Sequence, residues 1–211
     1  MAAFRLRQAR ASDRQEAIQL YCCDELRARG LRAAEIEVPI AGAYRTKRWD
    51  VGMVIDSEPR LAISCKSIIA NHGGTVPNRV DDMLGEAVNL HRRWPRAVIG
   101  YLFMMARVDE SLASTRRRQH LRARGYPEDV ILEEARESGG RWFARLGESV
   151  SQASGRESEA DLPEMFEAVS CSLVGFEVSP LFPVEYHPST PRPAEFFDIL
   201  AETYTERFGR K

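Results

Sequence analysis

A run of ten apolar or glycine residues at positions 97–106 restricts the fold more than any other feature of the chain. The run is about half as long as the roughly 20 residues that a helix needs to cross a membrane. It closely follows Pro95, which ends the preceding segment. A strand that is apolar on both faces fits the centre of a sheet that helices cover on each side. Residues 97–105 are therefore expected to form a buried central strand of an α/β fold.

The residues before this run show helical and strand patterns in turn. Apolar residues at helical spacing predict helices over 12–30 and 78–94. Between them, segments 35–40, 49–55 and 60–69 have strand character and are joined by short turns, which predicts an antiparallel meander. The order helix, three strands, helix, strand describes an α/β/α sandwich with a mixed central sheet.

The second half of the chain is more irregular, and we expect it to add helices and a further strand to the same single domain. A proline-rich segment within it is expected to have no regular structure. The expected elements are helices at 109–124 and 128–138, a loop at 149–161, a short helix at 163–169, a strand at 172–178, the proline-rich segment 180–193 and a closing helix at 193–208.

The charged residues exclude one class of protein. Thirty Lys and Arg residues against 31 Asp and Glu residues leave a formal charge of −1, so the chain is not a globally cationic, histone-like binder. Only Lys47, Lys66 and Lys211 are lysines, so a lysine at a chemically demanding position is less expected by chance. The four cysteines contain no Cys-x-x-Cys pair, and the N-terminus lacks an apolar signal segment, which predicts a cytoplasmic protein with free thiols.

The residues that carry chemistry lie in the second and third expected strands. Asp50 opens the second strand, and Ser64 and Lys66 lie in the third. Because side chains alternate along a strand, Ser64 and Lys66 share one face. A carboxylate and a lysine at neighbouring strands suit metal-assisted phosphodiester hydrolysis, in which the carboxylate holds Mg²⁺ and the lysine orients or activates the attacking water.

The order of these motifs resembles the PD-(D/E)XK nuclease superfamily, which has the restriction-endonuclease-like fold. The resemblance covers residues 12–106, the expected catalytic core, and leaves 107–211 as a helical and proline-rich elaboration. The segments Trp49-Asp50-Val51-Gly52 and Ile63-Ser64-Cys65-Lys66-Ser67-Ile68 are most similar to type II restriction enzymes and related defence nucleases.

This resemblance implies an activity, a cofactor and partners. It implies a bacterial, cytoplasmic endonuclease that cuts double-stranded DNA with Mg²⁺, for which Mn²⁺ can substitute. Such enzymes commonly act as homodimers on two-fold symmetric sites and are paired with a cognate DNA methyltransferase. The elaboration would then supply dimer contacts or sequence specificity.

The chain departs from the family pattern at Ser64, where an acidic residue is expected two positions before the lysine. A hydroxyl is a poor replacement for a metal-binding carboxylate. Some relatives have a Ser-x-Lys strand and take the acid from the following helix. In the expected helix, Glu86 lies at the edge of the apolar stripe and is the first choice for that acid, with Asp82 second. Glu35 and Glu37, on the first strand, are weaker candidates.

Candidate DNA contacts lie outside this cluster. Arg116, Arg117 and Arg118 begin the most basic run of the chain, which suits phosphate contacts, although a solvated helix face explains the same run. Asn71, Asn78 and Arg79 are of residue types that read base edges in a groove; in this sequence they flank the start of the second expected helix.

Two alternatives to a nuclease stay open. The chain could be a non-catalytic DNA-binding or scaffolding module that kept the fold after losing its acid at position 64. It could instead bind a methyltransferase or helicase as a protein partner. For a nuclease, the residues also leave RNA open as the substrate.

Overall fold

The computed structural model describes residues 11–109, 115–175 and 183–209, which form an α/β fold with a mixed six-stranded sheet and, within these ranges, five helices. The elements are α2 (Ala11–Ala28), β1 (Glu35–Ala41), β2 (Thr46–Ile55), β3 (Glu58–Ile68), α3 (His72–His91), β4 (Val98–Ala106), α4 (Thr115–Ala123), α5 (Glu128–Ser151), β5 (Ala168–Val174), β6 (Val184–Tyr186) and α6 (Pro193–Phe208).

The strand order in the sheet follows the order in the chain, from β1 to β6. Strands β1, β2 and β3 pair antiparallel, which confirms the predicted meander. Strand β4 pairs parallel with both β3 and β5, and β6 closes the sheet as an antiparallel edge strand. The predicted class, α/β with a mixed sheet and β4 at its centre, is confirmed.

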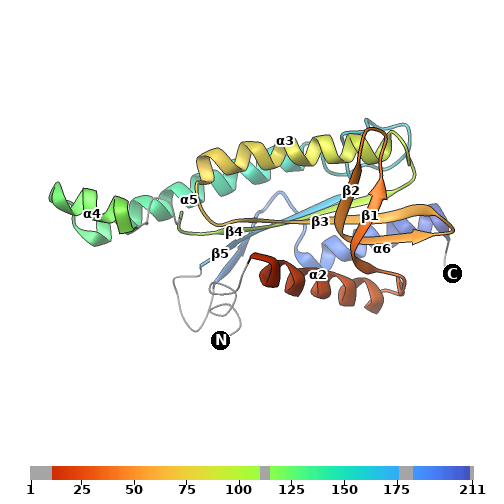
Figure 1. The fold of residues 1–211 in the computed structure, drawn as a ribbon, viewed down its shortest axis with the longest axis horizontal. Coiled ribbons are helices and arrows are strands. Elements are labelled where there is room, and N and C mark those ends of the chain that lie inside the picture. Colours follow the sequence, from red (N-terminus) through yellow and green to blue (C-terminus); the bar gives the residue numbers. More distant parts are fainter. Residues whose placement is uncertain (1–10, 110–114, 176–182, 210–211) are drawn as a thin grey trace.

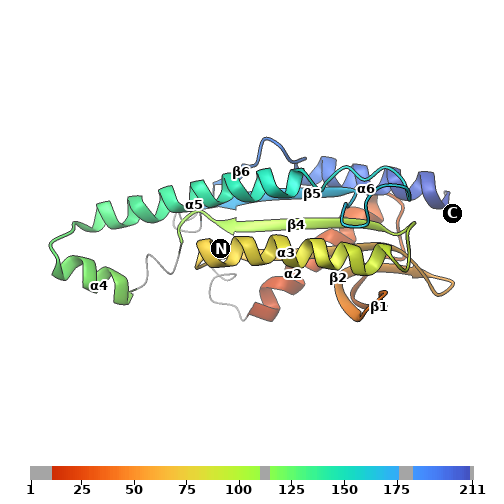
Figure 2. The same ribbon diagram turned by 90° about the horizontal axis from the view of Figure 1, so that it is seen from above.

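Helices cover both faces of this sheet (Figures 1 and 2). Helices α3 and α5 pack on one face and α2 and α6 on the other. The sequence of β4 is apolar throughout because its side chains enter the core on both sides. Tyr101 and Phe103 belong to the α3 side of the core, and Val98 and Leu102 to the α2 side. Both faces of β4 are therefore buried under helices.

Helix α4 and the N-terminal part of α5 project beyond the end of the sheet as an arm (Figures 1 and 2). The sequence predicted a helix that ends at 138 and a loop that starts at 149. Helix α5 instead continues to Ser151, through the residues between them and the first residues of the expected loop. Glycines made this segment difficult to predict from sequence. A side chain at Gly139 would collide with the carbonyl of Arg107, and one at Gly147 with the ring of His187, so both glycines serve close packing inside a helix.

Three expectations about local structure were wrong. Helix α3 begins at His72 rather than 78, because the carboxylate of Asp109 accepts the backbone N–H groups of Asn71 and His72 and caps its start. Segment 163–169 forms no helix; Phe166 bridges to Ser154, and β5 starts soon after. The proline-rich segment contains β6, which as an edge strand tolerates nearby prolines. Residues 176–178 of the expected strand lie outside the described ranges.

Gly100 offers a test of how tightly α6 packs on β4. A Cβ atom there would lie 2.7 Å from Leu200 Cδ1 and 2.8 Å from Phe196 Cζ. We expect Gly100→Ala to lower the free energy of unfolding by about 1–3 kcal/mol through overpacking, measured by urea denaturation. The matched control is Gly140→Ala in α5, where nothing lies within 4 Å of the added atom. There the free energy should rise by up to about 1 kcal/mol, because alanine favours a helix over glycine; equal effects at the two sites would contradict the packing argument.

Candidate functional site

Strand β3 presents Ser64 and Lys66 to the face covered by α3, as the alternation predicts. Ala62 and Ile68, at the same parity, belong to the core beneath α3. Cys65 points to the opposite face, where its Sγ lies 3.8 Å from that of Cys22. Ser64 and Lys66 therefore share a face, and Glu86 of α3 lies within reach of it.

The β1–β2 pair loses its regular alternation at Asp50. Trp49 packs on the α3 side of the sheet and Val51 on the α2 side. The register is the same before and after this point, with the pairs Ile36–Val51 and Val38–Trp49, but Glu37 and Asp50 do not pair, and Glu37 has a φ of 56°, in the left-handed region. This irregularity lets the Asp50 carboxylate contact groups from both α2 and β3.

The Asp50 carboxylate is almost fully buried and accepts hydrogen bonds at both oxygens. Its Oδ2 accepts the Ser64 hydroxyl at 2.9 Å and the backbone N–H of Cys65 at 2.7 Å. Its Oδ1 accepts the side-chain amides of Gln19, at 3.2 Å, and Gln15. The two glutamines come from successive turns of α2, so this helix fixes the orientation of the carboxylate.

Glu86 faces two ammonium groups. Lys66 Nζ donates to its Oε1 at 2.9 Å, and Lys47 Nζ lies 2.5 Å from its Oε2. Oε2 is buried, and its close contact is this ion pair with Lys47. The Glu86 side chain is only 7% exposed, which makes both contacts stronger than a surface ion pair.

Lys47 is a member of the site that the sequence analysis did not select. It lies in β2, packs over the Trp49 ring at 4.0 Å from the centroid, and places Nζ 3.2 Å from Ser64 Oγ. Burial lowers the pKa of Lys47 to about 8, with the attraction of Glu86 opposing the shift and the charge of Lys66 adding to it. The scarcity of lysine in the chain was the signal that could have identified it.

These contacts form one connected network that runs from Asp50 through Ser64 and Lys47 to Glu86 and Lys66. The described residues contain no group of three or more His, Cys, Asp and Glu side chains arranged to hold a metal. Two carboxylates are nevertheless enough for Mg²⁺, which keeps several waters and is commonly bound through one or two carboxylates. Glu86 Oε2 is of the donor type that Mg²⁺ prefers, and in this structure it faces Lys47.

The other predicted site residues are not brought to this network. Asp82 is exposed and pairs with Arg79 at 3.3 Å, and Asn78 is exposed near the start of α3. The backbone of Asn71 precedes α3. The basic run falls on α4, in the projecting arm, and the side chains of Arg116, Arg117 and Arg118 lie outside the described part of the structure.

Of the weaker candidates, Glu37 reaches the network and Glu35 does not. Glu37 Oε1 accepts the Gln19 amide at 2.5 Å, and the same amide nitrogen donates to Asp50. Glu35 is exposed. The glutamines at positions 15 and 19, four residues apart on one helix face, were the second set of site residues that sequence reasoning missed.

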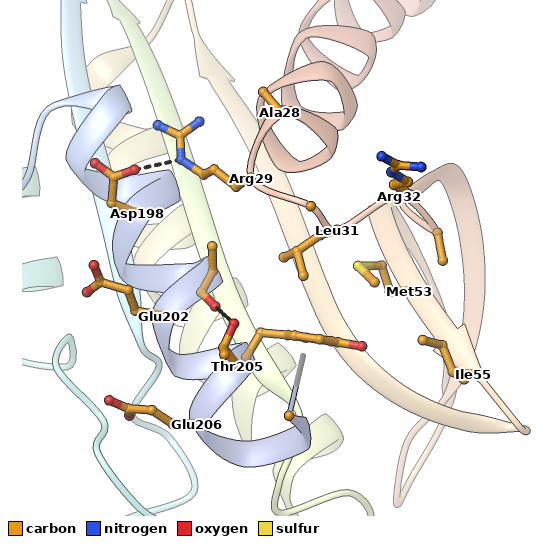
Figure 3. A pocket seen from close by; sticks show the side chains of 15 residues that line it. Ala28, Arg29, Leu31, Arg32, Met53, Ile55, Asp198, Glu202, Thr205 and Glu206 are labelled. Atoms are coloured by element: carbon orange, nitrogen blue, oxygen red, sulfur yellow. Dashed lines mark hydrogen bonds and ion pairs between the residues drawn. The ribbon is translucent and has the colours of Figure 1, made fainter. Parts of the chain in front are cut away.

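A separate hollow of about 970 Å³ lies on the opposite side of the sheet (Figure 3). Its walls come from the end of α2, strand β2 and helix α6, and the Arg29–Asp198 ion pair lies at its edge. None of the network residues lines it. The hollow and the carboxylate–lysine network are therefore distinct features.

Comparison of the chain with protein-family models, with curated proteins and with solved structures finds no match in any of the three. Within the described ranges, no helix is both long enough and apolar enough to cross a membrane. The functional interpretation therefore rests on the network itself.

The two ammonium groups make Glu86 important for stability as well. We expect Glu86→Gln to lower the free energy of unfolding by about 2–4 kcal/mol, because it leaves two buried cations without their counter-ion. Urea denaturation in EDTA measures this, with the exposed Asp81→Asn on the same helix as the control. Adding Lys47→Met to Glu86→Gln should recover part of the loss, and a further additive loss would contradict the charge argument.

The pKa of Lys47 sets a pH dependence. With a folded value of about 8 below the unfolded value of 10.5, the unfolded chain binds more protons between these pH values. The stability of the wild type relative to Lys47→Met should therefore rise as the pH increases from about 7.5 to 9.5. Paired denaturation series across this range measure the difference, and a flat or falling difference would contradict the shift.

Proposed function

We propose that the protein is a Mg²⁺-dependent endonuclease that hydrolyses DNA phosphodiester bonds, of the type II restriction or phage-defence class. The observation that supports the proposal is that the Asp50–Ser64 and Glu86–Lys66 contacts are connected through Lys47 into one network. These residues come from two strands and the following helix and are far apart in the chain. The acid that position 64 lacks is available from α3, as the Ser-x-Lys variant of the PD-(D/E)XK pattern requires.

In this proposal Asp50 and Glu86 would hold Mg²⁺, and the ion would supply charge neutralisation at the phosphate and activation of a water. Lys66, fixed by Glu86, orients the attacking water near the phosphorus. Ser64, Gln15 and Gln19 hold the Asp50 carboxylate in place. Hydrolysis adds the water oxygen to phosphorus, breaks one P–O ester bond and leaves a phosphate monoester and a hydroxyl.

The proposal extends to the partners of the enzyme. A two-fold symmetric DNA site requires a homodimer, in which each protomer cuts one strand. The projecting arm of α4 and α5 and segment 180–193 are candidates for dimer or DNA contacts. Base reading by Asn71, Asn78 and Arg79, a cognate methyltransferase and the bacterial cytoplasm stay predictions of the resemblance.

A non-catalytic DNA-binding module is the second candidate. The observation in its favour is that Asp50 already accepts four hydrogen bonds and both Glu86 oxygens face lysines. In such a module the network would serve stability alone.

Cleavage assays separate the two candidates. Purified protein is incubated with unmethylated phage DNA in Mg²⁺, in Mn²⁺ and in EDTA. We expect discrete fragments with either metal and none in EDTA. Lys66→Met and Glu86→Gln should each reduce the cleavage rate by about 100-fold or more, the size of loss seen when a charge-stabilising group is removed from other hydrolytic sites. A gel shift in Ca²⁺ should still show DNA binding by both variants.

The matched control is Asp81→Asn, an acid-to-amide change at an exposed position of the same helix, which should cleave like the wild type. DNA binding without cleavage of several methylated and unmethylated DNAs would favour the binding module. Cleavage that survives both Lys66→Met and Glu86→Gln would exclude this site as the active centre.

A further inference from the structure

The ammonium of Lys47 occupies the junction between the two carboxylates. Its Nζ lies 2.5 Å from Glu86 Oε2 and 3.2 Å from Ser64 Oγ, and Ser64 in turn donates to Asp50. A single positive charge therefore sits between the groups that the proposed function assigns to Mg²⁺.

The two lysines that face Glu86 are held differently. Lys66 donates a hydrogen bond to Oε1 at 2.9 Å, whereas Lys47 Nζ lies 2.5 Å from Oε2 and also donates a hydrogen bond to Ser64 Oγ at 3.2 Å. The ammonium also lies over the Trp49 ring, 4.0 Å from its centroid, and the Lys47 side chain keeps 13% of its surface exposed. Lys47 therefore contacts groups on both the Glu86 and the Asp50 side of the site, whereas the hydrogen bond of Lys66 goes to Glu86.

A divalent cation that binds both carboxylates would meet the Lys47 charge at short range. Coulomb repulsion grows with the charge, so a divalent ion would be repelled by the ammonium twice as strongly as a monovalent ion at the same distance. The oxygen that Mg²⁺ requires, Glu86 Oε2, is also the one that Lys47 covers.

We propose that Lys47 is an internal counter-ion that occupies the metal site while it is empty and leaves it when a divalent cation binds. The proposal rests on the proposed function, because it takes Asp50 and Glu86 as the metal ligands. Once displaced, the ammonium stays tethered next to the site, where it is free to pair with the phosphate of the substrate. Lys47 thus acts as a positioning residue that links metal loading to phosphate capture.

The scarcity of lysine makes the displacement directly observable. The chain contains three lysines, so protein labelled with ¹³C-lysine gives three Cε–Hε signals in an NMR spectrum. Lys47→Met and Lys66→Met assign them. In EDTA at pH 6, we expect the Lys47 signal to be shifted by the Trp49 ring.

On addition of Mg²⁺ alone, the Lys47 signal should move to the position of a free, charged lysine while the Lys66 signal stays shifted. A Lys47 signal that stays in place, or that moves to the position of a neutral amine, would overturn the proposal. An unchanged signal would mean that Lys47 is not displaced, and a neutral-amine position would mean that Lys47 shares the site with the metal.

Calorimetry supplies the second measurement and tests the proposed function separately. We expect Lys47→Met to bind Mg²⁺ about tenfold more tightly than the wild type, since a competing charge is gone. Arg45→Met, which removes an exposed charge from the same hairpin, should leave the affinity unchanged.

If the wild type binds Mg²⁺ and Glu86→Gln weakens that binding, but Lys47→Met does not tighten it, only the role of Lys47 is overturned. If the wild type binds no Mg²⁺, the proposed function fails and the counter-ion role fails with it.

Discussion

The hydroxyl of Tyr101 fixes the height of α3 above the sheet, and the candidate site depends on it. This hydroxyl donates to the backbone carbonyl of Met83 at 2.9 Å, and the ring is fully buried against Trp49 and Phe166. Glu86 follows Met83 by less than one helical turn, so the same contact sets how far its carboxylate lies from β3. Burial and the charge of Glu86 raise the pKa of Tyr101, which keeps the hydroxyl protonated as a donor.

The parts of the fold that sequence could predict are those that local patterns control. The meander, the apolar strand β4 and the limits of α6 follow from alternation, apolar runs and a proline at a helix start. The start of α3 did not follow, because its cap comes from Asp109, which is remote in the chain. Helix α5 was underestimated because Gly139 serves a tertiary contact rather than a turn.

The candidate site divides in the same way. Ser64 and Lys66 on one face, and Glu86 at the edge of the α3 stripe, could be predicted because each depends on the period of a single strand or helix. Lys47 was missed because β2 begins at Thr46, three residues before the expected strand at 49–55, although Lys47 lies in the regularly paired part of β2. Gln15 and Gln19 were missed because amide side chains on a helix carry no charge signal.

Charge balance explains how the carboxylates of Asp50 and Glu86 can both be buried in this network. Asp50 is stabilised by four neutral donors, so its charge needs no cation beside it. Glu86 has few such donors and relies on two ammonium groups instead. Both ammonium groups of the network therefore lie beside Glu86 rather than beside Asp50. A divalent cation held by both carboxylates would replace the charge of Lys47 at Glu86 and keep the buried site close to neutral. At Asp50 the same ion would have to compete with the hydrogen bonds that hold the carboxylate.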